Sequence, residues 1–416
     1  MLTNLLLIPL FATIVFILIL YPFATKIGLT DNPTHRKQHK EPTPLIGGLA
    51  IYLALLFTLS LNHVNLPNQT AYISAATLLV LVGLIDDYKN LGVKIRLLAQ
   101  IAASLIMTEM ADIKINDLGE LFASGNVNLG IYATTFTVFA VVGGINAFNM
   151  IDGIDGLAGS LSLISIIAIA AISWLFQHWA LLDFCLIMIA AIIAFLLFNL
   201  RIFGRTNAKI FLGDTGSTLF GFTICWMAIY ASQGEHRIIS PTMVLWIIAV
   251  PLFDSVCIML RRMSKGRSPF APDREHLHHI LSLAGYSVNQ TLTTLLVCSF
   301  TLSTTAIIAS FFLNIPEGIL FISFVLLFGC HYWGMSHAWK IMKIARYLRN
   351  MRSDEERTRD RRKKTRRIAE HAIADDKRVL PDRRVNPDRR FIPSARQLEK
   401  ISRRKNKKVI KIPKLF

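Results

Sequence analysis

Long apolar blocks are the feature that most limits how this chain can fold. The chain has 416 residues, of which 53% are hydrophobic and only 17% are charged. The apolar residues gather in blocks of about 20, the length that a helix needs to cross a bilayer. The blocks cover residues 3–22, 44–62, 69–85, 96–111, 131–148, 158–176, 180–199, 211–231, 240–260, 291–313 and 318–336. We therefore expect an all-α polytopic membrane protein with about eleven transmembrane helices, since each helix satisfies its own backbone hydrogen bonds in lipid.

The first block could also be a signal peptide that is removed after export. Signal peptides typically have a basic segment before the apolar run and a small-x-small cleavage site after it. No Lys or Arg precedes this block, and no such cleavage site follows it. We expect the block to be kept as the first membrane helix.

Basic residues alternate between the loops that separate the blocks. Residues 1–336 contain 17 Lys and Arg, and 15 of these lie in every second loop. The other two, Lys114 and Arg237, lie in the opposite loops. Cytoplasmic loops of membrane proteins carry the excess of Lys and Arg. The pattern predicts that the N-terminus lies outside and that eleven crossings bring the C-terminus to the cytoplasm.

The last part of the chain, residues 337–416, differs in composition from the rest. It holds 28 Lys and Arg against 10 Asp and Glu, an excess equal to the formal net charge of the whole chain, +18. We interpret residues 1–336 as a membrane-embedded domain and residues 337–416 as a basic cytoplasmic tail, partly disordered, that lies on anionic lipid headgroups. A docking segment for a protein partner is the second interpretation. Charge alone also permits nucleic-acid binding, but we expect none, because nothing else in a membrane protein of this kind requires it.

Acidic and histidine side chains gather on the side predicted to be cytoplasmic. Five aspartates lie at the ends of apolar blocks, namely Asp86, Asp87, Asp152, Asp155 and Asp214. The basic loop after the ninth block also carries His276, His278 and His279. The predicted orientation therefore brings eight chemically active side chains to one face of the membrane.

Each of these side chains also has a purely structural interpretation. Asp86 and Asp87 could form a solvated helix end, although the loop that follows them is basic. Asp155 and Asp214 could be N-caps of the helices that follow them. A cap, however, does not need the Gly-x-x-Gly segments that surround both residues and that let a ligand approach the backbone closely. The histidines could be ordinary surface residues.

Together these residue types favour chemistry on phosphates. Carboxylates without cysteine ligands suit a hard cation, Mg²⁺ or Mn²⁺. Histidines, basic side chains and helix N-termini suit a diphosphate, and a membrane-embedded scaffold suits a lipid substrate. Phosphoryl transfer needs mainly positioning and neutralisation of charge. The residues therefore predict a metal-dependent phosphotransferase that acts on a lipid at the cytoplasmic face.

A membrane transporter or lipid carrier is the rival function class. Transporters keep their ionisable residues near the middle of the membrane. In this chain nearly all the charge lies at the cytoplasmic ends of the apolar blocks, which favours chemistry at the membrane surface. Asp254, late in the ninth block, is a partial exception and could line the same cleft.

Four motifs follow one another along the chain. They read Gly83-Leu84-Ile85-Asp86-Asp87, Asn146-x-x-Asn149-x-x-Asp152-Gly153-x-Asp155-Gly156-Leu157-Ala158, Phe211-Leu212-Gly213-Asp214-x-Gly216-Ser217 and His276-x-His278-His279. In this order they resemble the polyprenyl-phosphate N-acetylhexosamine-1-phosphate transferases. Members of that family join a sugar 1-phosphate from a UDP-sugar to a polyprenyl phosphate and release UMP.

The loop Arg267-Ser268-Pro269-Phe270-Ala271-Pro272-Asp273-Arg274-Glu275-His276-Leu277-His278-His279 indicates the branch of the family. It is similar to the WecA-type branch, which uses UDP-N-acetylglucosamine (UDP-GlcNAc). The branch that uses UDP-MurNAc-pentapeptide tends to carry three consecutive histidines, whereas Leu277 interrupts them in this chain. The resemblance implies transfer to undecaprenyl phosphate in the bacterial cytoplasmic (inner) membrane, at the start of O-antigen, common-antigen or similar polysaccharide synthesis. It also implies a homodimer, and another UDP-N-acetylhexosamine stays open as the donor.

The resemblance further implies roles for individual residues. Asp214 would bind Mg²⁺ or Mn²⁺, with Asp86 near the metal. Asp86 and Asp87 would act at the reacting centre, either as a base in direct attack or as a nucleophile, two routes that the residues do not distinguish. Asp152 and Asp155 would hold the nucleotide sugar or organise the metal site. The implied substrate contacts are Lys94, Asn149, Asn199, Arg262, His276, His278 and His279, with Asn199 alternatively a helix cap.

Overall fold

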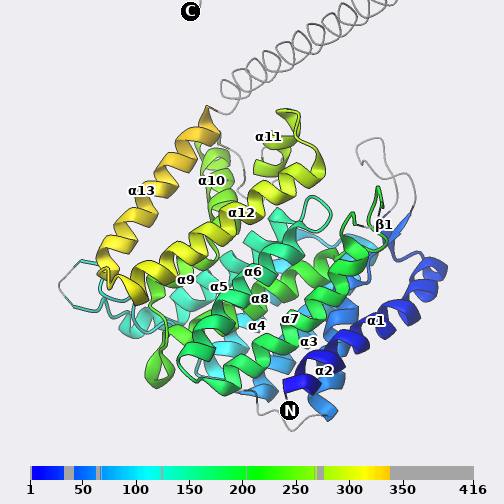
Figure 1. Cartoon of the computed structure of the whole chain (residues 1–416), viewed down its shortest axis with the longest axis horizontal. Helices are drawn as coiled ribbons and strands as arrows, with labels where there is room; N and C mark the ends of the chain where they lie inside the picture. Colours follow the sequence, from blue (N-terminus) through cyan, green and yellow to red (C-terminus); the bar gives the residue numbers. More distant parts are fainter. Residues whose placement is uncertain are drawn as a thin grey trace, which may run out of the picture. The chain divides into compact units, whose positions relative to one another are not determined.

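The computed structural model describes residues 2–31, 42–61, 66, 68–122, 125–202, 204–266, 268 and 276–337. Helices make up most of this part of the chain (Figure 1). The basic tail assigned to residues 337–416 lies, except for its first residue, outside the described residues. Its expected role on lipid headgroups therefore stays a prediction.

The elements follow one another along the chain as helices joined mostly by short connections, with η marking short 3-10 or π segments. They are α1 Leu2–Ile27, β1 Thr30–Asp31, β2 Thr43–Pro44, α2 Gly47–Leu61, α3 Gln69–Lys89, α4 Val93–Met110, η1 Gly130–Tyr132, α5 Ala133–Ile151, α6 Leu157–Leu175, α7 Trp179–Asn199, α8 Gly213–Ser232, η2 Gly234–His236, α9 Pro241–Ile247, α10 Ala249–Ser264, α11 Leu277–Leu283, α12 Val288–Ile307, η3 Ile308–Phe312 and α13 Glu317–Ser336. The strands β1 and β2 form a short antiparallel pair before α2.

The helices confirm an all-α multi-pass membrane protein. Each apolar block of the sequence contains a helix, or in the ninth block two helices. Within the described residues, seven helical segments are long and apolar enough to cross a bilayer, and the bent pair α9–α10 would make an eighth. Three of the expected spans, α2, α4 and α8, fall short of that test. Helix length and composition therefore support fewer crossings than the eleven expected.

The ninth block is bent, although its composition predicts one helix over residues 240–260. It forms α9 and α10, whose axes differ by 84°. Ser240 caps α9 by accepting a hydrogen bond from the N–H of Met243, and Pro241 occupies the first turn, where a missing N–H costs nothing. Ile248 leaves the helical conformation between the two helices. The bend turns α10 so that it can carry Asp254 toward α11.

Helix α8 is the centre of the bundle. It contacts α2, α3, α5 and α6 and lies among them in Figure 1. A Cβ added to Gly83 of α3 would stand 2.6 Å from the Cα of Thr215, and one added to Gly221 would stand 2.6 Å from the Cα of Ile145 in α5. Glycine thus lets α8 pack backbone to backbone against two neighbours, as small residues do in membrane bundles. The start of α8 comes to lie beside the ends of α3 and α5.

The two basic residues that break the alternation of charge both have acidic partners. The Lys114 ammonium lies 2.7 Å from Asp112. The Arg237 guanidinium lies 3.1 Å from Asp117 and 3.3 Å from Glu317. Each positive charge is therefore neutralised within the protein.

Candidate active site

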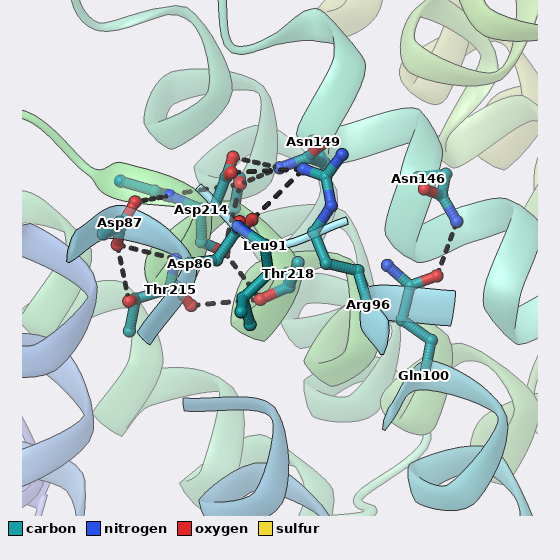
Figure 2. A network of polar contacts seen from close by, with 12 residues as sticks. Asp86, Asp87, Leu91, Arg96, Gln100, Asn146, Asn149, Asp214, Thr215 and Thr218 are labelled. Atoms are coloured by element: carbon teal, nitrogen blue, oxygen red, sulfur yellow. Dashed lines mark hydrogen bonds and ion pairs between the residues drawn. The ribbon is translucent and has the colours of Figure 1, made fainter. Parts of the chain in front are cut away.

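Asp87, near the end of α3, caps the start of α8 (Figure 2). Its carboxylate accepts hydrogen bonds from the backbone N–H groups of Asp214 (2.7 Å) and Thr215 (3.1 Å) and from the Thr215 hydroxyl (2.6 Å). These N–H groups belong to the first helical turn, where the helix itself supplies no acceptor and a negative charge is stabilising. The sequence suggests that the start of this helix favours a phosphate, but Asp87 already satisfies these two N–H groups.

Gly213 makes this cap possible. Its φ of +75° lies in the left-handed region, which favours glycine. A Cβ at this position would also stand only 3.0 Å from the Cγ of Asp87. Both conformation and space therefore require glycine at this position. The alternative interpretation of Asp214 as the N-cap of this helix is wrong, because Asp214 lies inside the first turn.

Asp86 is held by the chain that follows it. The residue is only 4% exposed. One carboxylate oxygen accepts from the N–H of Leu91 (2.5 Å), and the other lies 3.2 Å from the Nη1 atom of Arg96. The same Nη1 atom lies 3.3 Å from a carboxylate oxygen of Asp214. One guanidinium is thus shared by two carboxylates.

Arg96 is a site residue that sequence reasoning misses. By sequence it counts only as a cytoplasmic charge, because the fourth apolar block begins at this residue. The helix begins earlier, at Val93, so Arg96 belongs to the first turn of α4. Arg96 lies only ten residues after Asp86, with a short turn between the two helices. This spacing is the sequence signal from which their ion pair could have been predicted.

Asn149, on α5, completes this cluster. Its Nδ2 donates to a carboxylate oxygen of Asp214 (2.7 Å) and to the Ser217 hydroxyl (2.8 Å). One turn earlier, Asn146 donates to Gln100 of α4 (2.7 Å). The Asp214 side chain is 38% exposed and so stays accessible to a ligand. Four helices, α3, α4, α5 and α8, therefore contribute side chains to this cluster (Figure 2).

Asp152 differs from the other aspartates because its carboxylate has no hydrogen-bond or ion-pair partner among the described residues. It follows α5 directly, as the residue that ends the helix. Burial, and next the negative charges of Asp214, Asp87 and Asp155, raise the pKa of its carboxyl from the ordinary 3.8 to about 8. An uncompensated carboxyl of this kind favours the approach of a cation.

This raised pKa predicts a pH-dependent stability of the metal-free protein. A carboxyl that binds its proton more tightly when folded stabilises the fold fully below pH 3.8, and that contribution is lost as the pH rises through about 8. Asparagine does not titrate. In detergent with a chelator, the Tm of the wild type should therefore fall more than that of Asp152→Asn when the pH is raised from about 6 to about 9. An equal difference in Tm at both pH values would contradict the assignment.

Asp155 and Asn199 bind the connection between α7 and α8. Asp155 accepts from Nε of Arg201 (2.7 Å) and from the N–H of Ala208 (3.2 Å). Asn199 is 4% exposed, accepts from the N–H of Gly156 (2.8 Å) and donates to the carbonyl of Ile210 (2.9 Å). These bonds explain both residues structurally. A direct role for either in catalysis or substrate binding stays a prediction.

The histidine block packs inward instead of lying on the surface. His278 is 2% exposed, and neither of its ring nitrogens has a hydrogen-bond partner among the described residues. Burial lowers the pKa of His278 to about 3, so the ring is neutral. A Cβ added to Gly153 would collide with this ring. His278 therefore reaches the residue next to Asp152, and the centroid of the His279 ring lies 4.2 Å from that of His278.

The remaining expected contacts lie on two other helices. Lys94 is exposed in the first turn of α4, and Arg262 is 4% exposed in the last turn of α10. Their contacts with substrate stay predictions.

The donor groups of the site fit a hard cation. Within the described part of the chain, no three His, Cys, Asp or Glu side chains converge as a ready metal site. Mg²⁺, however, is usually held by one or two carboxylates together with waters and substrate phosphates. The accessible carboxylate of Asp214 and the unpartnered one of Asp152 offer such a pair. Among the described residues, Arg96 supplies the positively charged side chain that contacts the Asp214 carboxylate.

Comparison with known proteins identifies the family. Residues 69–232 match the family described as "Glycosyl transferase family 4". Over 351 residues, the chain is 39% identical to the undecaprenyl-phosphate alpha-N-acetylglucosaminyl 1-phosphate transferase of Escherichia coli O157:H7, an alignment that covers 84% of this chain and 95% of the relative. The chain belongs to glycosyl transferase family 4.

This family-4 chain has further relatives of the same name. The protein of Salmonella typhimurium is 39% identical over 361 residues, covering 87% of this chain and 97% of the relative. The protein of Pasteurella multocida is 37% identical over 338 residues, covering 81% of this chain and 93% of the relative. The resemblance inferred from the four motifs is thus confirmed. The matched segment, residues 69–232, contains all five aspartates of the site but not the histidine block.

Proposed function

We propose that this member of glycosyl transferase family 4 transfers N-acetylglucosamine 1-phosphate from UDP-GlcNAc to undecaprenyl phosphate and releases UMP. The names of the relatives support this activity, since the similarity extends over most of both chains. The observation that carries the proposal is the cluster of aspartates around the start of α8, where one carboxylate lacks a partner among the described residues. A transporter has no evident use for such a cluster at its helix ends.

The reaction is a phosphoryl transfer. An oxygen of the lipid phosphate forms a bond to the phosphorus that carries the sugar. The bond from this phosphorus to the bridging oxygen breaks, and UMP leaves with the electron pair. The protein must therefore hold two anionic substrates in line and neutralise their charge.

The residues of the site divide these tasks. Asp87 fixes the start of α8, so that Asp214 points at Asn149 and Arg96. Asp86 is buried, whereas the Asp214 side chain is accessible, which makes Asp86 a weaker candidate for the metal than Asp214. Asp152 supplies the open carboxylate, which would take up a proton or face the cation.

A metal ion fits this arrangement. Asp214 would hold Mg²⁺ or Mn²⁺, with Asp152 and Asp86 as the neighbouring carboxylates. When bound, the ion would neutralise diphosphate charge and favour the ionised form of nearby carboxyls. Lys94 and the histidine block would contact the nucleotide sugar.

We further propose eleven crossings, with the N-terminus outside and the site at the cytoplasmic face of the bacterial inner membrane. The alternation of basic loops supports this orientation. The pairing of Lys114 and Arg237 with acidic residues accounts for the two exceptions to the alternation. A homodimer and contact between the tail and lipid stay predictions.

Release of UMP tests the function. The purified protein, with Mg²⁺ and undecaprenyl phosphate, should release UMP from UDP-GlcNAc and not from UDP-MurNAc-pentapeptide. Omitting the lipid should abolish release, because the lipid phosphate is the acceptor. Release from a different UDP-N-acetylhexosamine alone would reassign the donor but keep the chemistry. No release from any donor would overturn the proposed function.

A further inference from the structure

Asp254 is a carboxylate that the proposed reaction does not use. It lies in α10, after the 84° bend, and is 0% exposed. A carboxylate buried this completely is costly unless its oxygens are hydrogen-bonded. Both oxygens have partners, and both partners belong to the histidine block. One oxygen lies 2.8 Å from Nδ1 of His276, and the other accepts from the N–H of Leu277 at 2.8 Å.

These two bonds determine where α11 begins. His276 precedes the helix, and Leu277 is its first residue. Among the described residues, the contacts of Asp254 are those that tie a side chain and a backbone N–H at this start to α10. Because Asp254 binds one side chain and the next backbone group, it sets both the place and the direction of the first turn.

His278 depends on this first turn. Its ring stacks on that of His276, with centroids 5.6 Å apart and planes 15° apart. Both of its ring nitrogens are buried without partners among the described residues, and the ring lies against Gly153. Buried polar atoms without a partner are rare in folded proteins, and a functional role is one explanation for them. The His278 ring thus lies beside Gly153, the residue that follows Asp152.

We propose that Asp254 is a positioning residue: it holds His276 and the first turn of α11 so that His278 faces the nucleotide sugar beside Asp152. This inference rests on the proposed function, because it takes the nucleotide sugar, the donor of the proposed reaction, as the ligand that His278 contacts. It adds a role for a residue that makes no contact with the reacting groups.

Enzyme kinetics supply the first test. Asp254→Leu should lower kcat/KM for UDP-GlcNAc by about 10–100-fold, by analogy with the loss on removal of the carboxylate that orients a metal-ligating histidine. KM for undecaprenyl phosphate should stay the same. His278→Ala should have a similar effect, and the double variant should be no worse than the poorer single variant, because both changes remove one function.

Two further variants separate positioning from folding. Asp254→Asn keeps an acceptor for the N–H of Leu277 but presents an amide N–H₂ to His276, which selects the other imidazole tautomer. Its kcat/KM should fall between those of the wild type and Asp254→Leu. Ser255→Ala is the matched control, because Ser255 is a buried neighbour that bonds only weakly to the carbonyl of Ala147 (3.4 Å). Its kinetics should equal those of the wild type.

A readout independent of activity distinguishes this inference from the proposed function. Diethyl pyrocarbonate should modify His278 slowly in the wild type, and several-fold faster in Asp254→Leu, as located by mass spectrometry of the labelled peptide. If no donor releases UMP but this protection changes, the proposed function fails and the positioning by Asp254 stands. Unchanged protection, unchanged kcat/KM in folded Asp254→Leu, or multiplied losses in the double variant would each overturn the inference.

Discussion

Asp214→Asn is expected to reduce the rate of UMP release by about 10³-fold or more, because Asp214 belongs to a group of residues that act as a unit. Its carboxylate accepts from Asn149 and lies beside Arg96. An amide at this position would turn an N–H₂ group toward one of these two donors, and the site would lose the negative charge that attracts a cation. Binding of Mn²⁺, measured by electron paramagnetic resonance, should weaken in parallel.

Asp183→Asn is the matched control for this substitution. Asp183 lies near the start of α7, whereas the site lies beyond the other end of that helix. Its removal changes the charge of the protein equally and should leave UMP release intact. A folded Asp214→Asn protein that keeps both its rate and its Mn²⁺ binding would refute the metal assignment.

Asp87→Asn is expected to have a comparable effect on rate with little effect on folding. Asparagine is also a good cap, so the start of α8 should remain in place. The negative charge beside the first N–H groups is lost, however. The amide nitrogen also replaces either the oxygen that accepts from Asp214 or the oxygen that accepts both bonds from Thr215. We expect a loss in UMP release of about 10³-fold, with a Tm close to that of the wild type.

Asp87→Ala should differ from Asp87→Asn in stability. Removal of the cap costs about 1 kcal/mol, which lowers the Tm by about 2 °C in a chain of this size. Thr215→Val is the control for the loss of a single bond to Asp87. It removes only the Thr215 hydroxyl and leaves the two backbone N–H bonds to the Asp87 carboxylate. If Asp87→Asn turns over at the rate of the wild type, the capping geometry alone would explain Asp87, and its charge would have no role in the reaction.

The helices are largely predictable from sequence, and the bend between α9 and α10 is not. Apolar blocks of membrane-spanning length locate helices because lipid leaves the backbone no other partner. The same composition hides a bend, since residues 240–260 are apolar on both sides of Ile248. The start of α4 is also hard to place, because Lys94 and Arg96 have the character of loop residues although they belong to its first turn.

The residue types of the site are predictable, but their partners are not. The motifs and the predicted orientation bring the aspartates to one face. Only the fold shows that Asp87 caps α8, that Asp155 bonds to Arg201 and that Asp152 has no partner among the described residues. These differences come from contacts between helices distant in sequence, which local patterns do not contain. By sequence His278 belongs to a surface loop, whereas it is buried against Gly153.

The cap that Asp87 places on α8 has a consequence for biosynthesis. The two partners are separated by 127 residues. At ordinary rates of translation, the ribosome needs on the order of 10 s to make that stretch. During this interval α3 is already synthesised, but its carboxylates have no helix start to bind. We therefore expect the newborn chain to be inactive until α8 is made, and a chain that terminates before that point to be an inactive membrane fragment.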